Sequence, residues 1–122
     1  MGRRILIVDD EADLVETIKL RLETGGYEVV TASDGAEALT KAKGDKPALI
    51  LLDVMMPKLN GYQVCRELKS DAACKDIPVV MLTAKTQQTD KFWGREVGAN
   101  DYITKPFEFS ALLDIIEKHL KK

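Results

Sequence analysis

Four short apolar runs in this chain each end at a residue suited to phosphate or metal chemistry. Residues 5–8 precede Asp9 and Asp10, residues 49–52 precede Asp53, residues 79–82 precede Thr83, and residues 102–104 precede Lys105. If the runs are neighbouring parallel strands, their carboxyl ends meet at one edge of a sheet. The sequence therefore predicts that three carboxylates, a hydroxyl and an ammonium converge on one crevice suited to Mg²⁺ and a phosphoryl group.

The apolar runs alternate with stretches of helical period, a pattern typical of βα units that feed a parallel sheet. Strands are expected over residues 4–8, 27–32, 48–52, 77–82 and 101–104, and helices over 12–24, 36–43, 62–70, 88–97 and 109–120. Right-handed crossovers then favour a doubly wound α/β fold of five βα units, with strand order 2-1-3-4-5 and helices on both faces. In that order, Asp10 and Asp53 flank the topological switch between the first and third strands.

Helical spacing also predicts which side chains face the core. The expected inner stripes are Leu14, Ile18 and Leu22 in the first helix, Val64 and Leu68 in the third, and Leu112, Ile116 and Leu120 in the last.

Length and charge limit the classes of function. The 122 residues fit one domain, residues 1–122, and 18 basic against 20 acidic side chains argue against a nucleic-acid surface built on charge. No apolar run approaches the roughly 20 residues of a membrane helix, and the N-terminus lacks a signal-peptide pattern. We expect a cytoplasmic protein without membrane or direct nucleic-acid partners.

The cysteines and the histidine offer no catalytic pattern. Cys65 and Cys74 have neither metal-site nor redox spacing, so we expect reduced thiols without a function. His119 lies in a Lys-rich terminal helix and is predicted to be exposed and solvated. A phosphohistidine donor would therefore have to come from another protein.

Each candidate site residue also has an ordinary interpretation. Asp9, Asp10 and Glu11 could form an acidic turn stabilised by a helix dipole. Asp53 could be a turn residue, and the Thr83 hydroxyl could cap the following loop or helix. Lys105 could be a surface charge, although Pro106 restricts its backbone and the bond between them could be cis. Four such coincidences at four strand ends are improbable together, so the joint pattern favours a phosphate and metal site, with Asp10 and Asp53 as ligands and Asp9 behind them.

Four segments of the chain resemble the receiver domains of two-component response regulators. They are ILIVDDE at residues 5–11, LILLDVMMPKLNG at 49–61, VVMLTA at 79–84 and GANDYITKPF at 98–107. The resemblance covers the whole chain and implies a CheY-like domain with a flavodoxin-like fold.

The resemblance implies specific roles at the site. Asp53 is the expected phosphoacceptor, and the expected phosphoryl contacts are Thr83, the Ala84 backbone and Lys105, with Pro106 in the following turn. The expected ligands of Mg²⁺, or of Mn²⁺ as a substitute, are Asp10, Asp53 and the Met55 backbone carbonyl, with Asp9 acting through water. Phosphoryl transfer needs little covalent chemistry beyond an in-line nucleophile, which agrees with this set.

The resemblance also implies a switch and partners. Thr83 would move toward the phosphoryl group while Tyr102 turns inward, changing an output surface formed by the helix at 88–97, the strand at 101–104 and the last helix. The expected donor is a sensor histidine kinase or a histidine phosphotransfer protein, and the output is a partner, an attached effector domain or a phosphorylation-dependent homodimer. Ile115 replaces an arginine used in one common dimer mode, which argues against that mode.

Two rival functions remain from the sequence. The first is a Mg²⁺-dependent phosphatase with Asp53 as nucleophile, although Met55 stands where haloacid-dehalogenase-type phosphatases have a second aspartate. The second is a nucleotide-binding module, although a glycine-rich loop is missing after the first strand. We expect no enzyme activity beyond self-phosphorylation from small donors and autodephosphorylation. The sequence leaves open a stand-alone regulator or the receiver of a longer one.

Overall fold

The computed structural model describes residues 3–54, 61–84 and 98–120. The strands are β1 (Arg4–Val8), β2 (Glu28–Ala32), β3 (Leu49–Asp53), β4 (Val79–Ala84) and β5 (Asp101–Lys105). The helices are α1 (Ala12–Thr24), α2 (Gly35–Asp45), α3 (Gly61–Ser70) and α5 (Phe109–Leu120). The helix expected at residues 88–97 lies outside the described residues, as does Met55. Among the described helices, none is long and apolar enough to cross a membrane.

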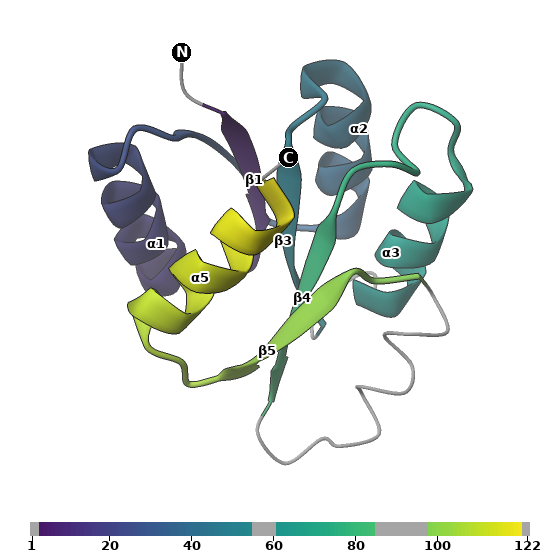
Figure 1. Ribbon diagram of the computed structural model, residues 1–122. Helices are drawn as coiled ribbons and strands as arrows, with labels where there is room; N and C mark the ends of the chain where they lie inside the picture. The colour runs from purple at the N-terminus through teal and green to yellow at the C-terminus, as the bar shows by residue number, and fades with distance from the viewer. Residues whose placement is uncertain (1–2, 55–60, 85–97, 121–122) are drawn as a thin grey trace.

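The strands form one parallel sheet in the order β2-β1-β3-β4-β5, which confirms the predicted topology (Figure 1). The observed β4 begins two residues later than expected because Pro78 has no N–H to donate, although its carbonyl still accepts from Ile50 N at 2.9 Å. It also runs on to Ala84, which pairs in register with Lys105. The carboxyl ends of the strands therefore lie along one edge of the sheet.

Alternate residues of each strand face two separate hydrophobic cores, one on each side of the sheet. In β1, Ile5 and Ile7 pack with α1 and α5, whereas Leu6 and Val8 pack with α2 and α3. The ribbon shows the same division, with α1 and α5 over one face and α2 and α3 over the other (Figure 1). All five residues of β3 are buried, as expected for a central strand covered on both faces.

The predicted helix stripes are confirmed with one exception. Val64, Leu68, Leu112, Ile116 and Leu120 are buried, as are Ile18 and Leu22. Leu14 is only partly buried, and Val15 takes the innermost position at the start of α1. The 3.6-residue turn explains the difference, because positions three and four before Ile18 both border the buried face.

The prediction that His119 is a solvated surface residue is wrong. Its Nε2 lies 3.0 Å from Asp101 Oδ2, and only 17% of its side chain is exposed. Lys118 Nζ lies 3.5 Å from the same oxygen. The last turn of α5 thus lies beside Asp101, the first residue of β5. Through these two contacts, Asp101 links β5 to α5.

Cys65 and Cys74 form no disulfide and are buried in the core beneath α2 and α3. Burial raises the pKa of the Cys65 thiol to about 11 despite the nearby Lys69 charge. Both side chains therefore contribute to the packing of this core.

Gly61 allows α3 to begin against the end of β3. A Cβ atom at this position would lie 2.4 Å from the Asp53 carbonyl oxygen and 2.8 Å from the Val54 Cα. Gly61 N also donates to Val54 O at 2.8 Å. The close approach of two backbones thus fixes the peptide units at Asp53.

We expect the Gly61→Ala variant to lose about 1–3 kcal/mol of unfolding free energy, because backbone atoms must move to admit the methyl group. The measurement is urea denaturation followed by circular dichroism. Gly44→Ala on α2 is the matched control, since a Cβ there meets no atom within 4 Å. That change should instead stabilise the helix by about 0.5–1 kcal/mol, and a similar loss in both variants would contradict the steric argument.

Asp101 predicts a pH dependence of stability. Burial alone would raise its pKa, but hydrogen bonds from His119 and Tyr102 N, with the Lys118 charge, outweigh burial and hold the pKa below its ordinary value. The ionised carboxylate therefore stabilises the fold above the ordinary pKa, and that contribution is lost as pH falls through the lowered one.

Asp101→Asn should accordingly reduce the unfolding free energy by about 1 kcal/mol near neutral pH. The difference from the unchanged protein should shrink below about pH 4. Denaturation curves across this range test it, with Asp114→Asn at an exposed position of α5 as the control. A difference that stays constant down to about pH 3 would refute this assignment.

Candidate functional site

The four charged side chains that the strand pattern predicts for this site meet at the carboxyl edge of the sheet. Asp9 and Asp10 follow β1, Asp53 ends β3 and Lys105 ends β5. Carboxylate oxygens of the three aspartates all lie within 4.8 Å of one another. The structure thus brings together the acidic residues and the lysine that the strand pattern placed at this edge.

Asp9 is the most deeply buried member of the acidic cluster, with none of its side chain exposed. Its Oδ1 accepts a hydrogen bond from Glu11 N at 2.9 Å, and its Oδ2 accepts one from Lys105 Nζ at 2.9 Å. Both oxygens therefore have protein partners. This arrangement suits a carboxylate that orients Glu11 and Lys105.

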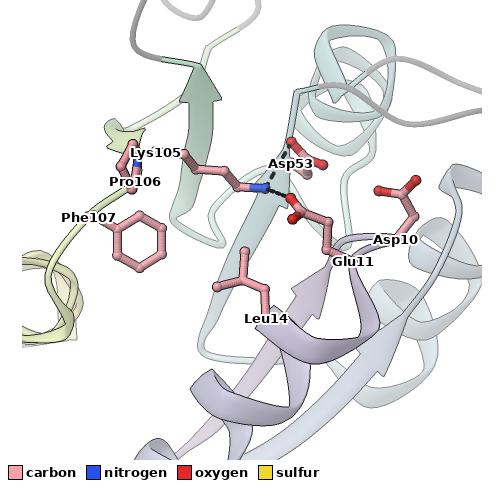
Figure 2. Close-up of a pocket in the computed structure, with 7 residues that line it drawn as sticks. All are labelled: Asp10, Glu11, Leu14, Asp53, Lys105, Pro106 and Phe107. Atoms are coloured by element: carbon pink, nitrogen blue, oxygen red, sulfur yellow. Dashed lines mark hydrogen bonds and ion pairs between the residues drawn. The ribbon is translucent and has the colours of Figure 1, made fainter.

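Asp10 and Asp53 face an open pocket of about 510 Å³. Asp10 is exposed, whereas only 8% of the Asp53 side chain is exposed. The other lining residues are Glu11, Leu14, Lys105, Pro106 and Phe107. Figure 2 shows the carboxylates of Asp10, Glu11 and Asp53 on one side and the aromatic ring of Phe107 on the other. A small anion can reach Asp53 from this pocket.

Lys105 is the cation of the site. Its Nζ lies 2.8 Å from Glu11 Oε1, 2.9 Å from Asp9 Oδ2 and 3.7 Å from Asp53 Oδ1. Burial alone would lower its pKa, but the hydrogen bonds to Glu11 and Asp9 and the charge of Asp53 outweigh burial and raise the pKa. Lys105 is therefore an ammonium at neutral pH and offsets the repulsion among the carboxylates.

Glu11 is a residue of this site that sequence reasoning missed. From the sequence, Glu11 has only a place in a possible acidic turn with Asp9 and Asp10 and at the end of the ILIVDDE segment. Its contact with Lys105 joins residues 94 positions apart, and no local pattern signals such a pair. Only the meeting of β1 and β5 at one edge of the sheet could have suggested it.

The remaining predicted site residues lie on β4, β5 and the turn that follows. Thr83 is buried near the end of β4 and pairs in register with Thr104. Ala84 ends the same strand opposite Lys105, and the peptide bond between Lys105 and Pro106 is cis. Tyr102 is partly buried against the core beneath α2 and α3.

The acidic cluster has the donor set of a hard divalent cation. Mg²⁺ and Mn²⁺ prefer oxygen ligands, and Mg²⁺ usually keeps several waters beside one or two carboxylates. Asp10 is accessible, and Asp53 lies beside it at the pocket wall. The residues present therefore fit such an ion.

Comparisons with known proteins agree with this geometry. The family model described as "Response regulator receiver domain" matches residues 5–117. The chain is 52% identical over 107 residues to the alkaline phosphatase synthesis transcriptional regulatory protein PhoP of Bacillus subtilis. That match covers 88% of this chain and 44% of PhoP, so the chain spans less than half of this relative.

Solved structures show the same fold. The chemotaxis protein CheY4 of Vibrio cholerae superposes with a TM-score of 0.92 at 34% identity, covering 98% of this chain and all of that one. The receiver domain of sensor histidine kinase PA1611 from Pseudomonas aeruginosa superposes with a TM-score of 0.91 at 31% identity, and both chains are covered completely. That structure has a magnesium ion coordinated in the active site cleft.

The fold, the acidic cluster with its lysine, and a family model that spans nearly the whole chain lead to one conclusion: this chain belongs to the response regulator receiver domain family.

Proposed function

We propose that this chain is a phosphoacceptor signalling domain in which Asp53 receives a phosphoryl group from a sensor histidine kinase or a histidine phosphotransfer protein. One observation carries the proposal: three carboxylates lie within 4.8 Å of one another beside the Lys105 ammonium, at the wall of an open pocket. The family membership of the chain supports the same function.

In the proposed reaction an Asp53 carboxylate oxygen attacks the phosphorus atom in line with the leaving group. The new bond is an acyl phosphate O–P bond, and the bond from phosphorus to the histidine nitrogen breaks. The electron pair of that bond stays on the imidazole, so the transfer needs no oxidant and no other co-reactant. With acetyl phosphate as a small donor, acetate leaves instead.

Asp10, Asp53 and the Met55 backbone carbonyl are the proposed ligands of Mg²⁺ or Mn²⁺, with Asp9 acting through water. When bound, the ion would neutralise charge on the phosphoryl oxygens. Lys105 adds a second positive charge on the β5 side, and Thr83 and the Ala84 backbone are the proposed hydrogen-bonding partners of the phosphoryl oxygens. Burial of Asp9 keeps its carboxylate in a fixed position.

We propose that phosphorylation is read out through β5, α5 and the helix expected at residues 88–97. Thr83 would move toward the phosphoryl group and Tyr102 would pack further inward, where it already contacts the core beneath α2 and α3. The output is a partner, an attached effector domain or a homodimer. Ile115 has no charge and packs partly buried against the core beneath α1 and α5, which argues against the dimer mode that uses an arginine at this position.

A phosphatase with Asp53 as nucleophile is the weaker candidate. Met55 stands at the position of the second aspartate in such enzymes, and the chain belongs to a signalling family. Steady turnover of small phosphate esters would distinguish that function.

The first test detects covalent phosphorylation. The purified chain incubated with acetyl phosphate and Mg²⁺ should gain one phosphoryl group by intact mass, and peptide mapping should locate it at Asp53. Asp53→Ala should gain none, whereas the exposed Asp114→Ala should react like the unchanged chain. If the unchanged chain neither gains mass nor binds beryllofluoride, this function is wrong.

A second test concerns the metal alone. Asp10→Asn removes an accessible carboxylate of the cluster and should weaken Mn²⁺ binding by at least about tenfold, because each such ion depends on one or two carboxylates. Paramagnetic broadening of backbone amide signals gives the affinity without any phosphorylation. Asp13→Asn in the first turn of α1 is the control of equal charge. Equal weakening in both variants would mean that general charge rather than ligation attracts the ion.

A further inference from the structure

Glu11 makes the shortest contact of Lys105. Its Oε1 lies 2.8 Å from Lys105 Nζ, whereas Asp53 Oδ1 lies 3.7 Å away, beyond hydrogen-bond distance. Figure 2 shows the Glu11 carboxylate reaching from the end of β1 toward this ammonium. In the unphosphorylated chain, two of the three ammonium hydrogens are therefore taken by Glu11 and Asp9.

The backbone of Glu11 is fixed while its side chain is accessible. Glu11 N donates to Asp9 Oδ1, and Glu11 O accepts from Val15 N in the first turn of α1. At the N-cap position a short polar side chain usually caps the helix, but Glu11 makes no such side-chain bond. Its side chain is 60% exposed, so it can leave Lys105 without moving the backbone.

A phosphoryl group on Asp53 would compete with Glu11 for the same ammonium. Both occupy the pocket that Glu11, Asp53 and Lys105 line together. Both are anions, so their charges repel each other as well. Asp9 differs, because its side chain is fully buried and does not line this pocket, so its contact with Lys105 does not compete with a phosphoryl group.

We propose that Glu11 is a positioning residue of the phosphorylation site, which holds Lys105 in the unphosphorylated state and releases it to the incoming phosphoryl group. This inference rests on the proposed role of Asp53 as phosphoacceptor. It adds a competition within the site, in which Glu11 opposes phosphorylation and favours its reversal.

The expected size of the effect follows from the exposure of the pair. Ion pairs with a largely exposed partner shift an equilibrium by about two- to fivefold. Glu11→Gln should therefore raise the affinity for beryllofluoride, measured at saturating Mg²⁺ by calorimetry, by about two- to fivefold. The rate of phosphorylation by acetyl phosphate should rise by a similar factor.

Glu16→Gln is the matched control. Glu16 lies on α1 and lines a neighbouring groove with Asp9 and Asp10, so this change removes the same charge near the acidic cluster and leaves the pair of Glu11 and Lys105 intact. The Glu11→Gln gain should clearly exceed that of Glu16→Gln. Equal gains would mean that general repulsion of the anion explains the result, and would overturn the proposal.

A second control uses the Lys105→Met background. If Glu11 acts by holding Lys105, the Glu11→Gln gain should disappear when Lys105 is absent. A gain that persists there overturns the proposal, because Glu11 would then act independently of the lysine.

A third readout needs no phosphorylation. ¹⁵N relaxation of the Lys105 ammonium in the phosphate-free chain should show greater mobility in Glu11→Gln than in the unchanged protein. Unchanged relaxation would overturn the proposal even if Asp53 is phosphorylated normally. Failure of the unchanged chain to bind beryllofluoride or accept phosphate would instead remove the proposed function on which it rests.

Discussion

The repulsion among three neighbouring carboxylates is the constraint on which the rest of the site depends. Asp9, Asp10 and Asp53 share one edge of the sheet, and like charges this close disfavour ionisation unless a cation lies among them. Lys105 supplies that cation from β5, although β3 and β4 separate its strand from β1. The strand order, which places all four residues at one edge, is therefore an electrostatic requirement as well as a packing result.

The two cores hold this charged edge in place. Alternate residues of β1 face α1 and α5 on one side of the sheet and α2 and α3 on the other. A shift in strand register would therefore expose one of the two cores. At the end of β3, the close approach of Gly61 to the Asp53 backbone adds a local restraint. Rigid strand ends let Asp9 remain buried with both oxygens bonded, while the accessible carboxylates face the pocket.

Apolar runs and helical periods were sufficient to predict the topology, the central position of β3 and the strand ends at Asp10, Asp53 and Lys105. They failed where a side chain's role depends on a distant partner. His119 pairs with Asp101 across 18 positions, and Glu11 pairs with Lys105 across 94. Periodicity reports which face a residue occupies, but such pairs depend on side-chain reach between elements that only tertiary structure brings together. The prediction of Leu14 in place of Val15 is a smaller error, because both residues border the buried face of α1.

Lys105 meets two different demands because its partners differ in exposure. Asp9 is buried and bonded on both oxygens, so its contact holds the ammonium at the site. Glu11 is mostly exposed and contributes a weak contact that water can replace. A two- to fivefold change in population corresponds to only about 0.4–1 kcal/mol, so a weak contact is enough to bias the site, whereas a strong contact would hold the lysine away from a phosphoryl group. A lysine with one buried and one replaceable partner can therefore stabilise the acidic cluster before the proposed phosphorylation and remain available for it.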